Sequence, residues 1–218
     1  MTATKATDFN AAKLKMQTMA TMQVAHNAQV HAEWRTQGYA YYRAIWVECA
    51  EMLDHFGWKW WKQQTPDLDQ VKLELVDIWH FALSELLRAE RLDDTVVEAL
   101  WGLESSGDCP DPEEFRVALE ALAADTLANR SFHVEPFVAT MAALPMSYDE
   151  LFTLYIGKNV LNHFRQDHGY KDGTYRKTWS GREDNEHLIE LMGAIDVAPD
   201  KFADALQAAL TERYADTE

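Results

Sequence analysis

Glycine, proline and cysteine are scarce in this chain, and each scarcity excludes a class of structure. Nine glycines and six prolines among 218 residues leave few tight turns, so a fold built from many short strands is not expected. The cysteines, Cys49 and Cys109, stand in no CxxC or Cys/His pattern, which argues against a disulfide framework and a zinc site. No run of eighteen apolar residues and no apolar signal segment occurs, so we expect a soluble, cytoplasmic protein without a membrane partner.

Positive charge is also scarce. Twenty Lys and Arg residues face 36 Asp and Glu residues, which gives a formal net charge of −16. Nucleic-acid polymers and anionic membranes both select for excess Lys and Arg, so neither is expected as a partner. A small anionic substrate remains compatible with this charge if the protein holds metal and carries a local basic patch.

The hydrophobic pattern predicts an all-α protein. Apolar residues recur at intervals of three and four rather than in strict alternation, and Ala, Leu, Glu and Met are abundant. The predicted helices span residues 10–31, 36–56, 69–90, 94–102, 112–128, 133–142, 148–168, 182–193 and 199–213. We interpret residues 1–218 as one domain, a helical bundle with a four-helix active-site core. Its parts are core helices in about 10–92 and 147–193, a cap or mobile helical region in about 93–146, and a C-terminal helix in 199–213.

Two pairs of carboxylates lie where buried apolar residues are expected. Glu48 and Glu51, and likewise Glu74 and Asp77, are three residues apart, and each pair shares a helix face with apolar neighbours. Burying one ionised carboxylate without a partner costs on the order of several kcal/mol, so converging acids indicate shared protons or bound divalent metal. Oxygen ligands of this kind suit Mg²⁺, with Mn²⁺ as a substitute, together with substrate phosphates.

A di-iron carboxylate bundle is a distant alternative for the same acids. Such bundles need two acid-x-x-His pairs to supply nitrogen ligands. Asp77 and His80 form one such pair, and no other histidine follows one of the four paired acids at this spacing. Because the paired acids supply one such motif rather than two, iron is the weaker interpretation.

Positive charge concentrates near the C-terminus, in a stretch that can bind phosphate. Lys158, Asn162 and Arg165 follow i, i+4, i+7 spacing and form one polar stripe, with Lys177 just beyond. Arg binds phosphate oxygens through two parallel hydrogen bonds and Lys acts as a compact countercharge. The alternative is that these residues only pair with the surplus acids. Tyr170, in a glycine-containing turn, either covers a nucleoside or packs.

Amides and tryptophans supply candidates for recognition of a base. Gln23 and Asn27 are four apart and project side by side, and such a pair can read a pyrimidine edge, although amides on exposed helix faces are routine. Trp58, Trp60 and Trp61 lie in the connection between the two acid pairs. Tryptophans in a connection usually pack, but one ring can provide a stacking surface for a base.

Together these motifs resemble the dimeric all-α dUTPases of the all-α NTP pyrophosphohydrolase superfamily, which occur in kinetoplastids, some bacteria and phages. The resemblance covers residues from about 20 to 90 and from about 150 to 190. It rests on the amide pair, the two acid pairs, the tryptophan connection and the basic stretch, in this order: Gln23/Asn27, Trp34-Arg35, Glu48-x-x-Glu51, Trp58-Lys59-Trp60-Trp61-Lys62, Glu74-x-x-Asp77-Ile78-Trp79-His80-Phe81, Lys158, Asn162, Arg165, Gly169-Tyr170-Lys171-Asp172-Gly173, Lys177 and Glu183-Asp184-Asn185.

The resemblance implies a homodimer that hydrolyses dUTP to dUMP and pyrophosphate, for nucleotide pool sanitation and dTTP precursor supply, in the cytoplasm or in the host cytoplasm of a phage. The four acids would be catalytic and would hold two or more Mg²⁺ ions. The implied substrate-binding residues are Gln23, Asn27 and Trp61 at the base, with His80 and Phe81 close by, Lys158, Arg165 and Lys177 at the phosphates, Asn162 at the sugar, and Tyr170 around the nucleoside. The alternative within this superfamily is a dCTP or broader dNTP pyrophosphohydrolase, because rotated amides read either uracil or cytosine.

Overall fold

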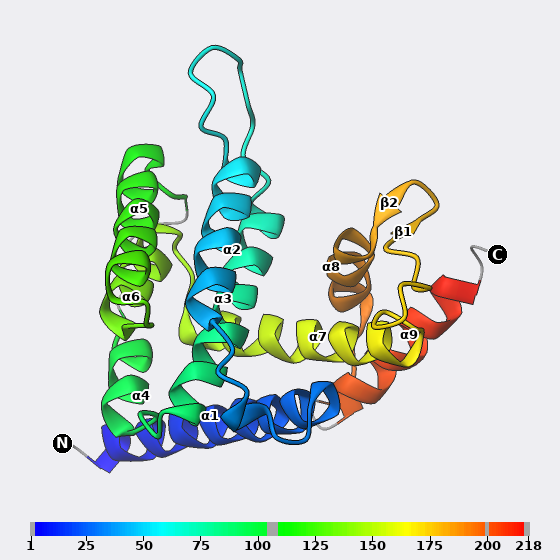
Figure 1. Cartoon of the computed structure of the whole chain (residues 1–218), viewed down its shortest axis with the longest axis horizontal. Helices are drawn as coiled ribbons and strands as arrows, with labels where there is room; N and C mark the ends of the chain where they lie inside the picture. The colour runs from blue at the N-terminus through cyan, green and yellow to red at the C-terminus, as the bar shows by residue number, and fades with distance from the viewer. Residues whose placement is uncertain (1–2, 104–108, 199–200, 216–218) are drawn as a thin grey trace. The chain divides into compact units, whose positions relative to one another are not determined.

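The computed structural model describes residues 3–103, 109–198 and 201–215, with side chains from residue 8 onward (Figure 1). This part of the chain is helical apart from one short strand pair, which confirms the all-α prediction. The elements are α1 (Ala3–Val30), the 3-10 helix η1 (Trp34–Thr36), α2 (Tyr41–Phe56), α3 (Leu68–Arg88), α4 (Asp94–Trp101), α5 (Pro112–Asn129), α6 (Val134–Ala143), α7 (Tyr148–Asp167), β1 (Thr178–Trp179), β2 (Arg182–Glu183), α8 (Asp184–Ala194) and α9 (Phe202–Ala215).

The predicted helices are present, with two clear differences at their starts. The first helix begins at Ala3 rather than near residue 10, because the residues before Asn10 favour a helix and contain neither Gly nor Pro. The second begins at Tyr41 rather than at residue 36, since η1 and Gly38, with a φ of 67°, separate it from α1. Residues 199–200 of the predicted last helix lie outside the described residues.

Clustering by contacts divides the chain into two compact units, Met1–Phe152 and Thr153–Glu218. In the first unit, α3 is the central helix. Its residues Leu73, Val76 and Trp79 are fully buried, and it packs most extensively against α2. Asp67 caps the start of α3 by accepting from the Gln70 amide. The antiparallel α2–α3 hairpin therefore stands at the core of the first unit.

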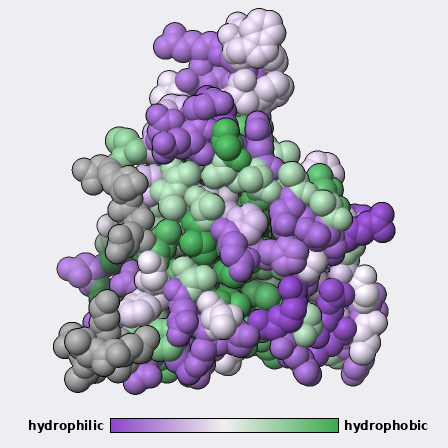
Figure 2. Space-filling view, turned by 90° about the vertical axis from the view of Figure 1, so that its left-hand side faces the viewer, coloured by the Kyte–Doolittle hydropathy of each residue, from purple (hydrophilic) through white to green (hydrophobic). Residues whose placement is uncertain are grey.

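The remaining helices of the first unit surround this hairpin. α1 contacts α3 and α4, while α5 contacts both α2 and α6. Figure 2 shows hydrophobic residues gathered in the middle of the face formed by α4, α5 and α6, with hydrophilic residues around them. Val117 and Leu127 of α5 are among the exposed large hydrophobic residues. No helix of the described residues is long and apolar enough to cross a membrane.

The second unit is organised around aromatic side chains. Phe164 of α7 and Trp179 of β1 are fully buried, and Tyr214 of α9 lies 5.4 Å and 5.1 Å from their ring centres. β1 and β2 pair antiparallel, with Thr178 opposite Glu183. This arrangement places the start of α8 directly after a tight turn.

Candidate active site

Three of the four predicted acids meet between α2 and α3. Glu48 of α2 and Glu74 and Asp77 of α3 each place one carboxylate oxygen within 4.8 Å of the others. Glu74 is buried and the other two are half-buried. The two helices bring these residues together because they run antiparallel and because the acids lie on the facing sides predicted from their apolar neighbours. We refer to Glu48, Glu74 and Asp77 as the acid cluster.

The electrostatics of the acid cluster are unfavourable without a cation. Burial, together with the charges of Asp77, Glu74 and Glu51, raises the pKa of Glu48 to about 9. Glu51 is exposed and lies outside the group of three oxygens, yet its charge acts on Glu48. Its role as a metal ligand stays a prediction.

The chemistry of the acid cluster fits a hard divalent cation. All three donors are carboxylate oxygens, and a cation would relieve the repulsion that raises the pKa of Glu48. Among the described residues, no histidine nitrogen joins this group of oxygens. A di-iron site, which needs imidazole ligands, fits less well.

His55 is a neighbour of the acid cluster that the sequence interpretation missed. Its Nε2 atom lies 3.6 Å from Oε1 of Glu74. The signal was present in the sequence, because His55 follows Glu48 by seven residues and Glu51 by four and so shares their face of α2.

The predicted amide pair is buried in a hydrogen-bonded network between α1 and α3. Gln23 donates from Nε2 to Oδ1 of Asn27 at 3.0 Å, and Asn27 donates from Nδ2 to Oγ of Ser84 at 2.9 Å. The Nδ1 atom of His80 lies 2.8 Å from Oε1 of Gln23. Ser84 also donates to the His80 carbonyl at 2.8 Å, and this bond links the two residues of the network that lie on α3. These amides are therefore not routine residues of an exposed face, and their orientation is fixed.

Ser84 was not anticipated, although it follows His80 by four residues and Asn27 is itself four residues after Gln23. This four-residue spacing on both α1 and α3 is the signal that predicts hydrogen bonds between the two pairs of side chains. Phe81, the other predicted neighbour of the base, is half-buried on α3.

The connection between α2 and α3, residues 57–67, carries the tryptophans, and we call it the tryptophan loop. It extends beyond the ends of both helices (Figure 1). Trp58, Trp60 and Trp61 are 44%, 90% and 57% exposed. The Trp61 ring meets the other two edge-on, with centroid distances of 5.2 Å and 5.4 Å. Trp61 therefore lies on the surface, where its ring is accessible to a base, and not in the core.

Three of the predicted nucleotide-binding residues, Lys158, Asn162 and Arg165, form a compact group around Asp184 and Asn185. Arg165 donates from Nε and Nη2 to the two carboxylate oxygens of Asp184 at 2.8 Å and 2.7 Å, and from Nη1 to Oδ1 of Asn162 at 3.2 Å. Lys158 is 1% exposed and donates from Nζ to Oδ1 of Asn185 at 2.8 Å. We call these five residues the Arg165 cluster.

Charges in the Arg165 cluster compensate one another. Burial opposes ionisation of Asp184, but the hydrogen bonds and charge of Arg165 outweigh it and hold the pKa of Asp184 below its ordinary value. Tyr175 also donates to Asp184 at 2.8 Å. Pairing with an acid, the alternative that the sequence left open, is therefore present for Arg165. Binding of phosphate by Lys158 and Arg165, and of the sugar by Asn162, stays a prediction.

The last two predicted residues are exposed. Tyr170 is 50% exposed, and its ring centre lies 6.1 Å from that of Tyr175. Lys177 places Nζ 3.6 Å from Oε2 of Glu183, with both side chains more than half exposed. Neither position is fixed by burial, so their roles at a nucleotide also stay predictions.

Comparison with known proteins supplies the family. No curated protein sequence matches the chain. A family model of dUTPases matches residues 15–170, which include the acid cluster, the amide network, the tryptophan loop and part of the Arg165 cluster. Because the match covers more than half of the 218 residues, the chain belongs to the dUTPase family and is an enzyme that hydrolyses dUTP.

Proposed function

We propose that this dUTPase depends on Mg²⁺ and converts dUTP and water to dUMP and pyrophosphate. The observation that carries the proposal is the acid cluster, three carboxylates within 4.8 Å whose mutual repulsion and burial raise the pKa of Glu48 to about 9. Such a cluster is costly unless a cation compensates it. Small oxygen-only sites completed by substrate phosphates are the usual setting for Mg²⁺.

The four acids have different roles in this proposal. Glu48, Glu74 and Asp77 hold the cation, and bound Mg²⁺ would neutralise charge on the phosphates. Glu51 lies on the same face of α2 but is exposed and outside the three-oxygen group. We assign Glu51 the role of orienting the attacking water and accepting its proton, because it lies next to the cation ligands without being one of the three clustered oxygens.

The amide network favours uracil over cytosine. Asn27 accepts from Gln23 and donates to Ser84, so its amide cannot rotate without losing two hydrogen bonds. In this orientation its NH₂ group offers a second N–H, which suits a carbonyl oxygen of uracil and opposes the amino group of cytosine. The dCTP alternative requires the amide to turn over against this network.

A turnover panel of dUTP, dCTP, dTTP and UTP with Mg²⁺ tests the substrate. We expect dUTP to be hydrolysed fastest, with dUMP and pyrophosphate as products by chromatography. Hydrolysis of dCTP at an equal or higher rate would contradict the assignment of dUTP as the preferred substrate.

Replacement of Glu51 tests the role of the acids. Glu51→Gln should remove Mg²⁺-dependent turnover while helicity by circular dichroism stays unchanged, because the side chain is exposed. Glu120→Gln, an exposed change on α5, is the matched control and should leave turnover within about twofold. Activity that survives Glu51→Gln contradicts the assignment.

The remaining roles given by the family resemblance belong to the same proposal. They are stacking by Trp61, support of the base by His80 and Phe81, phosphate binding by Lys158, Arg165 and Lys177, sugar binding by Asn162 and enclosure by Tyr170. A homodimer working in the cytoplasm completes it. Sedimentation at twice the chain mass of 25.0 kDa tests the oligomeric state, and a monomer that retains full activity would contradict it.

A further inference from the structure

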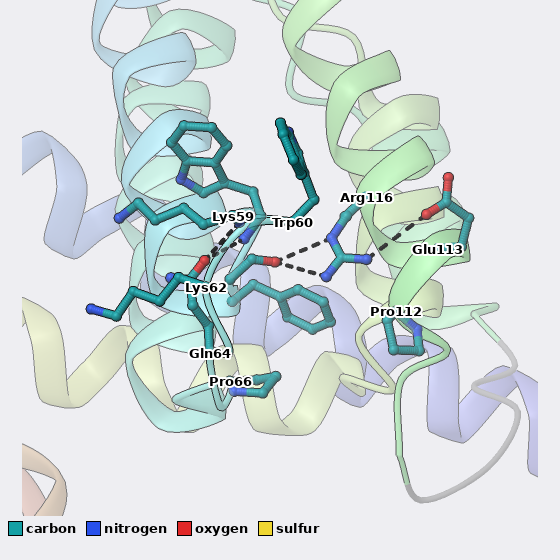
Figure 3. Close-up of a pocket in the computed structure, with 11 residues that line it drawn as sticks. Lys59, Trp60, Lys62, Gln64, Pro66, Pro112, Glu113 and Arg116 are labelled. Carbon is teal, nitrogen blue, oxygen red and sulfur yellow. Dashed lines mark hydrogen bonds and ion pairs between the residues drawn. The ribbon is translucent and has the colours of Figure 1, made fainter.

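The tryptophan loop is anchored at its start by two side chains from different places in the chain. Gln64 uses Oε1 to accept from the backbone amides of Trp58 and Lys59 at 3.0 Å and 2.7 Å. Arg116 of α5 donates from Nε and Nη2 to the Gly57 carbonyl at 3.1 Å and 2.8 Å. Figure 3 shows Arg116 reaching across from α5 while Gln64 reaches back within the loop. The first anchor is local, and the second ties the loop to a separate helix.

The end of α2 needs such an anchor. Gly57 is buried and follows the last residue of the helix, with a φ of 94° and its amide donating to the Leu53 carbonyl. A buried carbonyl without a partner is costly, and the carbonyl of Gly57 accepts from Arg116. Arg116 supplies two donors from one planar group, and both converge on the single carbonyl oxygen of Gly57.

Packing around Arg116 reinforces this contact. Its guanidinium carbon lies 5.5 Å from the centre of the Phe56 ring, and Phe56 in turn lies 4.2 Å from Phe115. Phe56 and Phe115 are fully buried. Two consecutive residues of α5 therefore hold two consecutive residues at the end of α2.

Trp58 and Lys59 also donate to Oδ1 of Asp54 on α2, at 3.0 Å and 2.9 Å, but the middle of the tryptophan loop is exposed. Trp60 is 90% exposed, and a pocket of about 420 Å³ separates the loop from the first turn of α5. In Figure 3, Lys59, Trp60 and Lys62 lie on the loop side of this pocket, and Pro112 and Glu113 lie on the α5 side. A segment with few buried contacts takes its position from the few bonds that fix its ends.

We propose that Arg116 is a positioning residue for the tryptophan loop. By fixing the direction in which the chain leaves α2, it holds the tryptophans where they contact the base. The helix α5, which belongs to the region predicted as a cap, thereby contributes to substrate affinity without touching substrate. This inference rests on the proposed role of Trp61 in base binding.

Two substitutions separate the contact from general packing. Arg116→Met keeps the apolar stem against Phe56 but removes both donors, and Arg116→Lys keeps the charge with a single point donor. We expect amides of residues 57–67 to exchange hydrogen about tenfold faster in Arg116→Met, while α3 exchanges as in the wild type. The KM for dUTP should rise about tenfold with kcat changed less than twofold, and Arg116→Lys should fall between.

Glu113→Gln is the matched control. Glu113 lies in the same pocket, 3.8 Å from Nη1 of Arg116, but makes no contact with Gly57. The Glu113→Gln substitution should leave both the hydrogen exchange of residues 57–67 and the KM for dUTP near the wild-type values. Unchanged exchange of the loop in Arg116→Met overturns the anchoring, and faster exchange with an unchanged KM overturns its link to substrate affinity. If the wild type does not turn over dUTP, the proposed function fails, whereas the exchange measurement still decides whether Arg116 holds the loop.

Discussion

The acid cluster and the Arg165 cluster both bury charge, but they compensate it in opposite ways. In the Arg165 cluster, Arg165 and Asp184 share two short hydrogen bonds, and the pKa of Asp184 is lowered. In the acid cluster, like charges face one another, and the pKa of Glu48 is raised to about 9. Opposite charges that pair within the fold stabilise it, whereas like charges gathered in one place are a candidate site for a cation from outside. Substitutions in the two clusters should therefore have opposite effects on stability.

The largest expected effect is the loss of turnover when the acid cluster is broken. Asp77→Asn should lower Mg²⁺-dependent hydrolysis of dUTP by about 1,000-fold, because transition-state stabilisation by the metal amounts to several kcal/mol. The same change should raise the melting temperature in EDTA, since it removes one of the repelling charges. Steady-state kinetics and thermal unfolding measure the two effects. A lower melting temperature in EDTA would show that the acid cluster is a structural element like the Arg165 cluster.

Breaking the Arg165 cluster should give the opposite result for stability. Asp184 is fully buried and the Arg165 side chain is 11% exposed. Asp184→Asn leaves a largely buried guanidinium without its countercharge and should lower the free energy of unfolding by about 3 kcal/mol. Urea unfolding followed by circular dichroism measures this. A loss below about 1 kcal/mol would mean that Arg165 is compensated by other groups.

The pH dependence of stability tests the raised pKa of Glu48. Its value in the folded protein is about 9 and its ordinary value is 4.5, so the folded state keeps a proton that the unfolded chain loses. The contribution of Glu48 to the stability of the metal-free protein is therefore fully present below about pH 4.5 and is lost as the pH rises toward 9. Glu48→Gln should remove this loss and stabilise the protein in EDTA at pH 8 by on the order of 1 kcal/mol. Identical pH profiles for the two proteins would contradict the prediction.

The smallest effect is expected at the exposed pair of Lys177 and Glu183. Both side chains are more than half exposed, and their closest charged atoms are 3.6 Å apart. Lys177→Ala should change the free energy of unfolding by less than about 0.5 kcal/mol. If Lys177 binds phosphate, the same variant raises the KM for dUTP. An unchanged KM would remove it from the proposed site.

Much of the fold followed from local sequence. The intervals of three and four between apolar residues predicted the helices, and the structure shows Asp67 at the start of α3 and Gly57 at the end of α2, two residue types that favour these positions. The start of α2 was misplaced because η1 contains ordinary helix-forming residues, and only the backbone path through Gly38 separates it. Helix boundaries depend on such tertiary competition more than on propensity.

In the candidate site, too, some residues could be predicted from the sequence and others only from the structure. Spacing alone identified Glu48, Glu74 and Asp77, because acids on an apolar stripe are unusual in any helical protein. It also identified Gln23 and Asn27, but not that Ser84 would bind and orient Asn27. The spacing of His55 from Glu51 indicates a shared face of α2, but not that His55 would lie 3.6 Å from Glu74 across the α2–α3 hairpin.

By itself, the sequence determined the helices, the faces on which acids and amides lie, and the family resemblance, because these depend on residues close together in the chain. The tertiary structure decided which charges are compensated. Arg165 meets Asp184 nineteen residues away, and Arg116 meets Gly57 fifty-nine residues away, and no local pattern encodes either contact. Those pairings arise only when helices pack, because packing alone fixes which side chains from distant segments come within hydrogen-bonding distance.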